Sequence, residues 1–272
     1  MVLIDVKAED VRSAQAGDRN ALEAVLSGTQ HQVHALARRI LVNPDDASEA
    51  TQEILILVLT KLSTFKGEAA FSTWVYRVAV RYLLNTRKIR DRDLGLTFDM
   101  FAADLESGLV ADPPKAPDDA LLLNELRISC TMAMLLCLKM ESRLAYVLGD
   151  IFELDHGEAS QILELTPATY RKRLSRARSE VEAFTSRHCG IVSTSAKCAC
   201  PRRLPAAMEA GRVQRGHYPN SANAKEGYAD IRAQVGAVIE DLKTFKLHRS
   251  VPHHECPEAI RVALTEILSP PA

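Results

Sequence analysis

Hydrophobic residues recur every three to four positions along most of the chain, which is the spacing of helices that bury one face. The clearest stripe lies in residues 166–181 and consists of Tyr170, Leu174, Ala177 and Val181. The run ILILVL at 54–59 could form a strand by propensity alone, but apolar residues on either side keep the helical spacing. The pattern therefore predicts an all-α protein, and the low glycine count of 12 in 272 residues agrees with it.

Charge and proline divide this pattern into four segments. Residues 8–90 and 121–187 are densely helical, whereas 91–120 carries eight acidic side chains, two basic ones and three prolines. Residues 188–272 begin with a cysteine-rich turn and continue into amphipathic helices near 231–245 and 260–268. We predict two helical domains joined by an acidic, mostly extended linker, followed by a small helical extension whose two helices form a hairpin on the preceding domains.

The overall composition excludes several classes of protein. The net charge is −1, so a polyanion can be bound only where basic residues are locally concentrated. The N-terminus lacks the pattern of a signal peptide, and the longest apolar run has six residues, far below the roughly 20 that a membrane span requires. We expect a cytoplasmic protein without a membrane partner, in which six cysteines are too sparse for a disulfide framework.

The helix predicted after Asn43-Pro44 is apolar on most sides. Such a helix lies either at the centre of a core or against a partner protein, and the sequence leaves both open.

A second helix, expected to be capped by Ser72, has an aromatic face and a basic face. Its polar side carries Arg77, Arg81, Asn85 and Lys88. Basic residues follow phosphates and aromatic rings stack on unpaired bases, so this combination is typical of single-stranded nucleic acid binding. The alternative is ordinary core packing for Trp74 and a solvated face for the arginines.

Residues 142–181 have the pattern of a helix-turn-helix. A short helix is followed by Thr166 as a cap and Pro167 as the first helical residue of a strongly basic helix. The side chains expected to face outward are Ala168, Thr169, Arg171, Lys172, Arg173, Ser175 and Arg176. A helix of this kind can read base edges in the major groove, although a charged surface helix remains the alternative.

Two of these stretches in this order resemble the extracytoplasmic-function (ECF) sigma factors of bacterial RNA polymerase. DDASEATQEILILVLTKLSTFKGEAAFSTWVYRVAVRYLLNTRK resembles their region 2, and SRLAYVLGDIFELDHGEASQILELTPATYRKRLSRARSEV resembles their region 4. Together with the linker, the resemblance covers roughly residues 10–187.

The resemblance implies a non-enzymatic subunit whose partners are core RNA polymerase and promoter DNA. Polymerase would be bound by Asp46, Glu49, Gln52 and Glu53. The −10 element would be recognised and held single-stranded by Lys66, Trp74, Arg77, Arg81, Asn85 and Lys88. The −35 element would be read by the outward residues of the helix after Pro167. Arg81 and Asn85 stand where the family often carries Asn and Asp, and Pro167 and Tyr170 are unusual in a recognition helix, so the preferred promoter sequence is open.

The extension contains His188, Cys189, Cys198 and Cys200, which offer four ligands, the number that zinc requires. The resemblance implies no required cofactor. The cysteine cluster therefore has three interpretations: a structural or sensing metal such as zinc, a thiol redox switch, or buried free cysteines. Cys130 and Cys137 lie on an apolar helix face and are expected to be core residues. We expect the extension to regulate the protein in cis, in place of a separate anti-sigma factor.

Two other functions fit parts of the sequence. A helix-turn-helix regulator that is not a polymerase subunit would explain residues 142–181, but not the two helices before residue 90. A metal enzyme built on the cysteine cluster would need a general base beside the metal, and the turn offers none.

Overall fold

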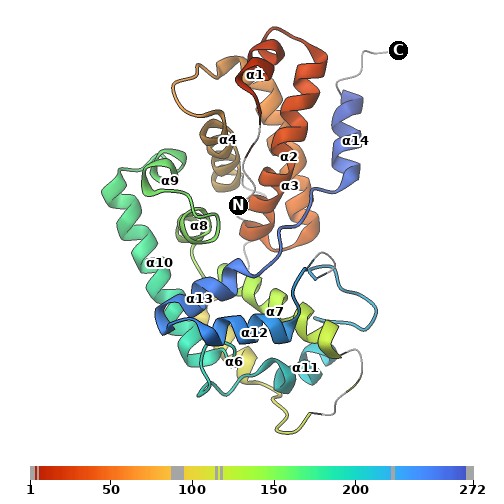
Figure 1. Ribbon diagram of the computed structural model, residues 1–272, viewed down its shortest axis with the longest axis vertical. Helices are drawn as coiled ribbons and strands as arrows, with labels where there is room; N and C mark the ends of the chain where they lie inside the picture. The colour runs from red at the N-terminus through yellow and green to blue at the C-terminus, as the bar shows by residue number, and fades with distance from the viewer. Residues whose placement is uncertain are drawn as a thin grey trace. The chain divides into compact units, whose positions relative to one another are not determined.

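The computed structural model describes residues 4, 6–86, 95–113, 116, 119–221 and 224–267, and in these residues it contains helices and no strand (Figure 1). The predicted all-α class is therefore confirmed. The chain divides into two compact units that each collect distant segments. Unit 1 consists of residues 1–93, 147–172 and 253–272, and unit 2 of residues 94–146 and 173–252.

Unit 1 is built around two long helices, α2 (Arg19–Leu41) and α3 (Pro44–Thr60), which pack along each other. Helix α3 begins at Pro44 as expected, and Asn43 caps it, since its side chain accepts hydrogen bonds from the Asp45 and Asp46 amides at 2.9 and 3.0 Å. A buried hydrogen bond of 3.0 Å joins His34 of α2 to Thr51 of α3. Ala47, Ala50, Ile54, Leu55 and Val58 are buried, so α3 is a core helix of this unit.

Shorter elements complete unit 1. They are α1 (Ala8–Gln15), the 3-10 turn η1 (Leu62–Thr64), α4 (Phe71–Asn85), the π-helical turn η2 (Val147–Ile151), α9 (His156–Ile162), the start of α10 (Pro167–His188) and α14 (Glu258–Ile267). The predicted cap at Ser72 is wrong, because α4 begins at Phe71 and Ala70 precedes it without a side-chain cap.

The last helix, α14, packs against α2 and α3 (Figure 1). Its Ile260 and Leu264 are 6% and 1% exposed. Just before it, the Cys256 amide donates a hydrogen bond of 3.1 Å to His31 Nδ1 of α2. Helix α14 is thus an integral layer on α2 and α3.

Unit 2 contains α6 (Phe98–Glu106), α7 (Asp119–Leu136), α8 (Met140–Tyr146), the rest of α10, α11 (Cys200–Glu209), α12 (Tyr228–Ala237) and α13 (Glu240–Arg249). The expectation that 91–120 is extended is wrong over Phe98–Glu106. Thr97 caps this helix by accepting a hydrogen bond from the Met100 amide at 3.2 Å, and Phe101 and Leu105 are buried. The prolines that suggested a linker all follow it.

The core of unit 2 is shared between α6, α7, the end of α10 and the extension. Phe184 of α10 stacks on Phe101 with ring centroids 5.5 Å apart, and Ile231, Val235 and Leu247 of the extension complete the cluster. The predicted single helix near 231–245 divides at Val238 into α12 and α13, which pack on each other and on α7. The predicted hairpin of that helix with 260–268 is therefore wrong.

Candidate nucleic-acid interface

An aromatic cluster lies at the start of α4. Phe65, Phe71 and Trp74 contact one another with ring centroids 5.3 to 5.7 Å apart. Beside this cluster is a cavity of about 300 Å³ whose lining includes Lys66, Trp74, Arg77 and Arg81. The structure thus brings together four of the six residues predicted to bind the −10 element. Such a cavity combines a stacking surface with cations, which is what an unpaired base and its phosphate require.

Of the other two predicted −10 residues, Asn85 does not line this cavity. Asn85 is exposed near the end of α4 and donates a hydrogen bond of 2.9 Å to the Arg81 carbonyl oxygen. Lys88 lies outside the described residues.

Both cavity arginines also contact the helix-turn-helix. Arg81 Nε donates to Glu164 Oε2 at 2.9 Å, and its Nη2 donates to Glu164 Oε1, so the pair is bidentate. Arg77 Nε donates to the Gln161 carbonyl oxygen at 3.3 Å. The hydrogen bond from Arg81 lowers the pKa of Glu164. Sequence reasoning missed Glu164, because partners 83 residues apart leave no periodic signal.

The helix-turn-helix itself has the predicted form. Asp155 caps α9, and Thr166 caps α10 by accepting a hydrogen bond from the Thr169 amide at 3.2 Å. The stripe Tyr170, Leu174, Ala177 and Val181 is buried as predicted. Glu164 lies in the turn with a φ of 55°, a left-handed conformation that closes the short connection between the helices.

The outward face of α10 carries the predicted −35 residues. Ala168, Thr169, Arg171, Lys172, Ser175 and Arg176 are exposed, and Arg173 is half-buried. The face therefore presents a dense positive charge with small residues near its N-terminal end, a geometry that fits a major groove.

The predicted polymerase-binding residues share the first three turns of α3. Glu53 is exposed, and Asp46, Glu49 and Gln52 are half-buried. Helix α3 is also one of the two helices that α14 covers.

The predicted zinc site is not supported by the structure. His188 Nδ1 lies 3.3 Å from Glu106 Oε1, and the His188 ring packs on Phe184. Within the described part of the chain, no group of three or more His, Cys, Asp or Glu side chains is arranged to hold a metal ion. We therefore assign no metal chemistry to the extension.

Cys130, Cys189, Cys198 and Cys200 instead pack together at the core of unit 2, where Cys198 is buried and the other three are half-buried. Burial, with the neighbouring Cys189 as a second cause, raises the pKa of Cys198 to about 11. Burial likewise raises the pKa of Cys130 on α7 to about 12, with Cys198 and Cys189 as additional causes. Cys130 and Cys137 both pack against the core of unit 2, as predicted. Gly190 allows the backbone at Cys198 to approach closely. Its amide donates a hydrogen bond of 2.8 Å to the Cys198 carbonyl oxygen, and a Cβ at position 190 would lie only 2.5 Å from that oxygen.

Comparison with known proteins decides between the candidate functions. Residues 27–93 match the family Sigma-70 region 2, and residues 128–181 match the family Sigma-70, region 4. The chain is an ECF sigma factor. It is 29% identical over 174 residues to the ECF RNA polymerase sigma-E factor of Escherichia coli K12, covering 63% of this chain and 90% of that protein. It is 26% identical over 175 residues to the RNA polymerase sigma-H factor of Pseudomonas aeruginosa, with the same shares covered.

A solved structure is also similar to this sigma factor. CnrH in complex with the cytosolic domain of CnrY is 19% identical, with a TM-score of 0.49 over 67% of this chain and 98% of that one. The family matches confirm the predicted function, which is to direct core RNA polymerase to promoters. Neither family match extends beyond residue 181, so the extension lies outside both. Of the helices in the described segments, none has the combination of length and apolar character needed to cross a bilayer.

Proposed function

We propose that this sigma factor recognises its promoter with the two surfaces described above and is held in a resting state by its own C-terminal extension. In the first surface, an unpaired base of the −10 element enters the cavity beside Trp74. Arg77 and Arg81 contact the adjacent phosphates. In the second, the exposed face of α10 reads the −35 element, while Asp46, Glu49, Gln52 and Glu53 of α3 bind polymerase. The sigma factor acts by binding alone and makes or breaks no covalent bond.

The observation that supports cis regulation is the position of α14 on α2 and α3. Helix α3 carries the residues proposed to bind polymerase, so α14 and polymerase would share this helix. The Arg81–Glu164 pair adds a second restraint, because Gln161 of α9 and Glu164 of the following turn engage the same arginines that the DNA requires. Both contacts are internal to unit 1.

Run-off transcription tests the proposal. Core RNA polymerase and a pool of genomic fragments of the host are incubated with and without the full chain, and new start sites are mapped. We expect start sites that depend on the protein and share a −35 and a −10 sequence. Absence of new starts with the full chain and with a variant whose α14 is released would overturn the proposal.

The residue assignments need a second comparison. Replacing Arg77 and Arg81 together by Ala is expected to abolish strand opening, measured as permanganate reactivity of −10 thymines. Arg12→Ala removes an exposed arginine from α1 in the same unit and serves as the control. Equal strand opening by the double variant and the control would contradict the proposed role of α4.

A further inference from the structure

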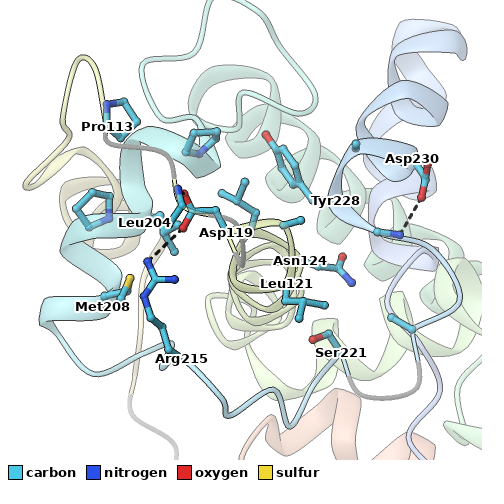
Figure 2. Close-up of a pocket in the computed structure, with 18 of the residues that line it drawn as sticks. Pro113, Asp119, Leu121, Asn124, Leu204, Met208, Arg215, Ser221, Tyr228 and Asp230 are labelled. Atoms are coloured by element: carbon cyan, nitrogen blue, oxygen red, sulfur yellow. Dashed lines mark hydrogen bonds and ion pairs between the residues drawn. The ribbon is translucent and has the colours of Figure 1, made fainter.

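Unit 2 contains a cavity of about 1070 Å³ that promoter recognition does not use (Figure 2). Its walls come from residues just before α7, from the first turns of α7 and α12, from the length of α11 and from the segment that precedes α12. Leu204, Pro205, Met208 and Tyr228 contribute to a mainly apolar lining, and Leu121 at the wall is 54% exposed. The volume is of the order of 300 to 1,000 Å³ that is typical of sites for drug-sized molecules.

The charged groups around the cavity are predominantly acidic. Among the described residues that line the cavity are four carboxylates, those of Asp112, Asp119, Glu226 and Asp230, and one cation, Arg215. Arg215 is already paired with Asp119, whose Oδ1 lies 3.3 Å from its Nη2. The other oxygen of Asp119 accepts a hydrogen bond of 2.7 Å from the Ala116 amide. Asp230 accepts a hydrogen bond from the Gly227 amide, and Glu226 accepts one from Gln234 and interacts with the charge of Arg127. Neutral donors leave the charges of these carboxylates in place, so the described lining is net negative.

The polar side chains of the lining are largely occupied by contacts within the protein. Asn124 donates to the Glu226 carbonyl oxygen at 3.3 Å and accepts from Arg127. Ser221 donates to Glu125 at 2.9 Å. An occupant therefore gains little from directional hydrogen bonds, but it does gain from apolar contact, from the carboxylates and from the ring of Tyr228, which favours a diffuse cation.

We propose that this cavity binds a lipophilic organic cation, such as a tertiary or quaternary ammonium or a phosphonium compound. The apolar body lies against Leu204 and Met208, and the charge is balanced by Glu226, Asp230 and Asp112. Because α7 and the residues just before it supply one side and the extension supplies the other, an occupant bridges the extension to the helix that precedes the helix-turn-helix. The site is therefore suited to an effector that stabilises unit 2.

The charge of the ligand can be tested with two ions of nearly equal size. Tetraphenylphosphonium and tetraphenylborate are titrated separately into the full chain by calorimetry. We expect the cation to bind in the micromolar range and the anion to bind at least tenfold more weakly. Glu226→Gln and Asp112→Asn should each weaken cation binding roughly threefold to tenfold, as expected for one charge a few ångströms away. Glu209→Gln makes the same charge change on an exposed position of α11 outside the cavity and should have no effect.

The location is tested by filling the cavity. Ala120 lines it from the first turn of α7 and is exposed, so Ala120→Trp can occupy the space without disturbing a core contact. We expect loss of cation binding with an unchanged thermal unfolding midpoint. Equal binding of both ions, no binding of the cation, or full binding by Ala120→Trp would each overturn the proposal. Binding is measured without polymerase, so these outcomes are independent of the proposed promoter recognition.

Discussion

Shortening Leu264 of α14 provides a direct test of cis regulation. Leu264 is 1% exposed against α2 and α3, and Ile260 is the other buried anchor. Leu→Ala at buried sites costs about 2 to 5 kcal/mol. We use the lower figure of about 2 kcal/mol, because α14 can detach without unfolding the rest of unit 1. A loss of about 2 kcal/mol reduces the ratio of docked to undocked α14 about thirtyfold. If docking blocks polymerase, the undocked fraction sets the apparent affinity.

The assay is a titration of the fluorescently labelled sigma factor with core polymerase. We expect Leu264→Ala to bind up to about thirtyfold more tightly than the natural chain, the limit being set by the loss of docking. Val262 lies on the same helix but is 46% exposed, so Val262→Ala is the matched control and should bind like the natural chain. Hydrogen exchange of the α14 amides reports separately whether the helix has been released.

These two readouts make the reasoning refutable. If exchange of α14 becomes faster in Leu264→Ala while polymerase affinity stays the same or falls, α14 does not compete with polymerase. The helix would then be a structural part of unit 1.

Four further predictions follow from individual contacts. Glu164→Gln should free Arg81 and so tighten binding of a single-stranded −10 oligonucleotide, measured by fluorescence anisotropy. The expected increase in affinity is up to about fivefold, which corresponds to the free energy of an exposed ion pair. Lys172→Ala should weaken binding of −35 duplex and lower the slope of log affinity against log salt by about one. Burial, helped by Arg38 and His31, lowers the pKa of His34 to about 4. As the pH is lowered, His34 of the unfolded chain therefore binds a proton before His34 of the folded chain does. The free energy of unfolding, measured by denaturant titration, should fall by up to about 3 kcal/mol as the pH is lowered from about 6.5 to about 4. Gly190→Ala should lower the thermal unfolding midpoint of unit 2 by several degrees, because its Cβ would meet backbone.

Each of these results has an outcome that contradicts it. Glu180→Gln removes an equal charge from an exposed position of α10 and controls for simple electrostatics in the Glu164 experiment. Equal tightening by both variants would remove the Arg81–Glu164 pair as a restraint. An unchanged salt slope would place Lys172 away from phosphate, and a pH profile unaltered by His34→Gln would assign the acid sensitivity to other groups. An unchanged midpoint for Gly190→Ala would mean that the turn can relax at low cost.

The elements that sequence predicted well are those determined by local chemistry. Asn43, Thr166 and Pro167 act within one helical turn of their own position, so their caps could be predicted. The stripe from Tyr170 to Val181 could be predicted for the same reason, since helical spacing determines which residues share a face.

The features that sequence reasoning missed depend on distant partners. Residues 98–106 contain only three turns with modest amphipathicity, and their helix is stabilised by packing of Phe101 on Phe184. The proposed zinc ligands were chosen by proximity in sequence, but His188 pairs with Glu106, a residue of the supposed linker. The cavity of Figure 2 draws its walls from segments up to about a hundred residues apart, and no periodicity reports it.

The long separation in sequence between α3 and α14 has a consequence for synthesis. Domains fold as they leave the ribosome, N-terminal parts first. Helix α3 ends at Thr60 and α14 begins at Glu258, so α2 and α3 are exposed to the cell while the residues between them and α14 are still being translated. A nascent sigma factor would pass through an uncovered state before it matures into the covered one. The competition between polymerase and α14 would then depend on how soon α14 leaves the ribosome.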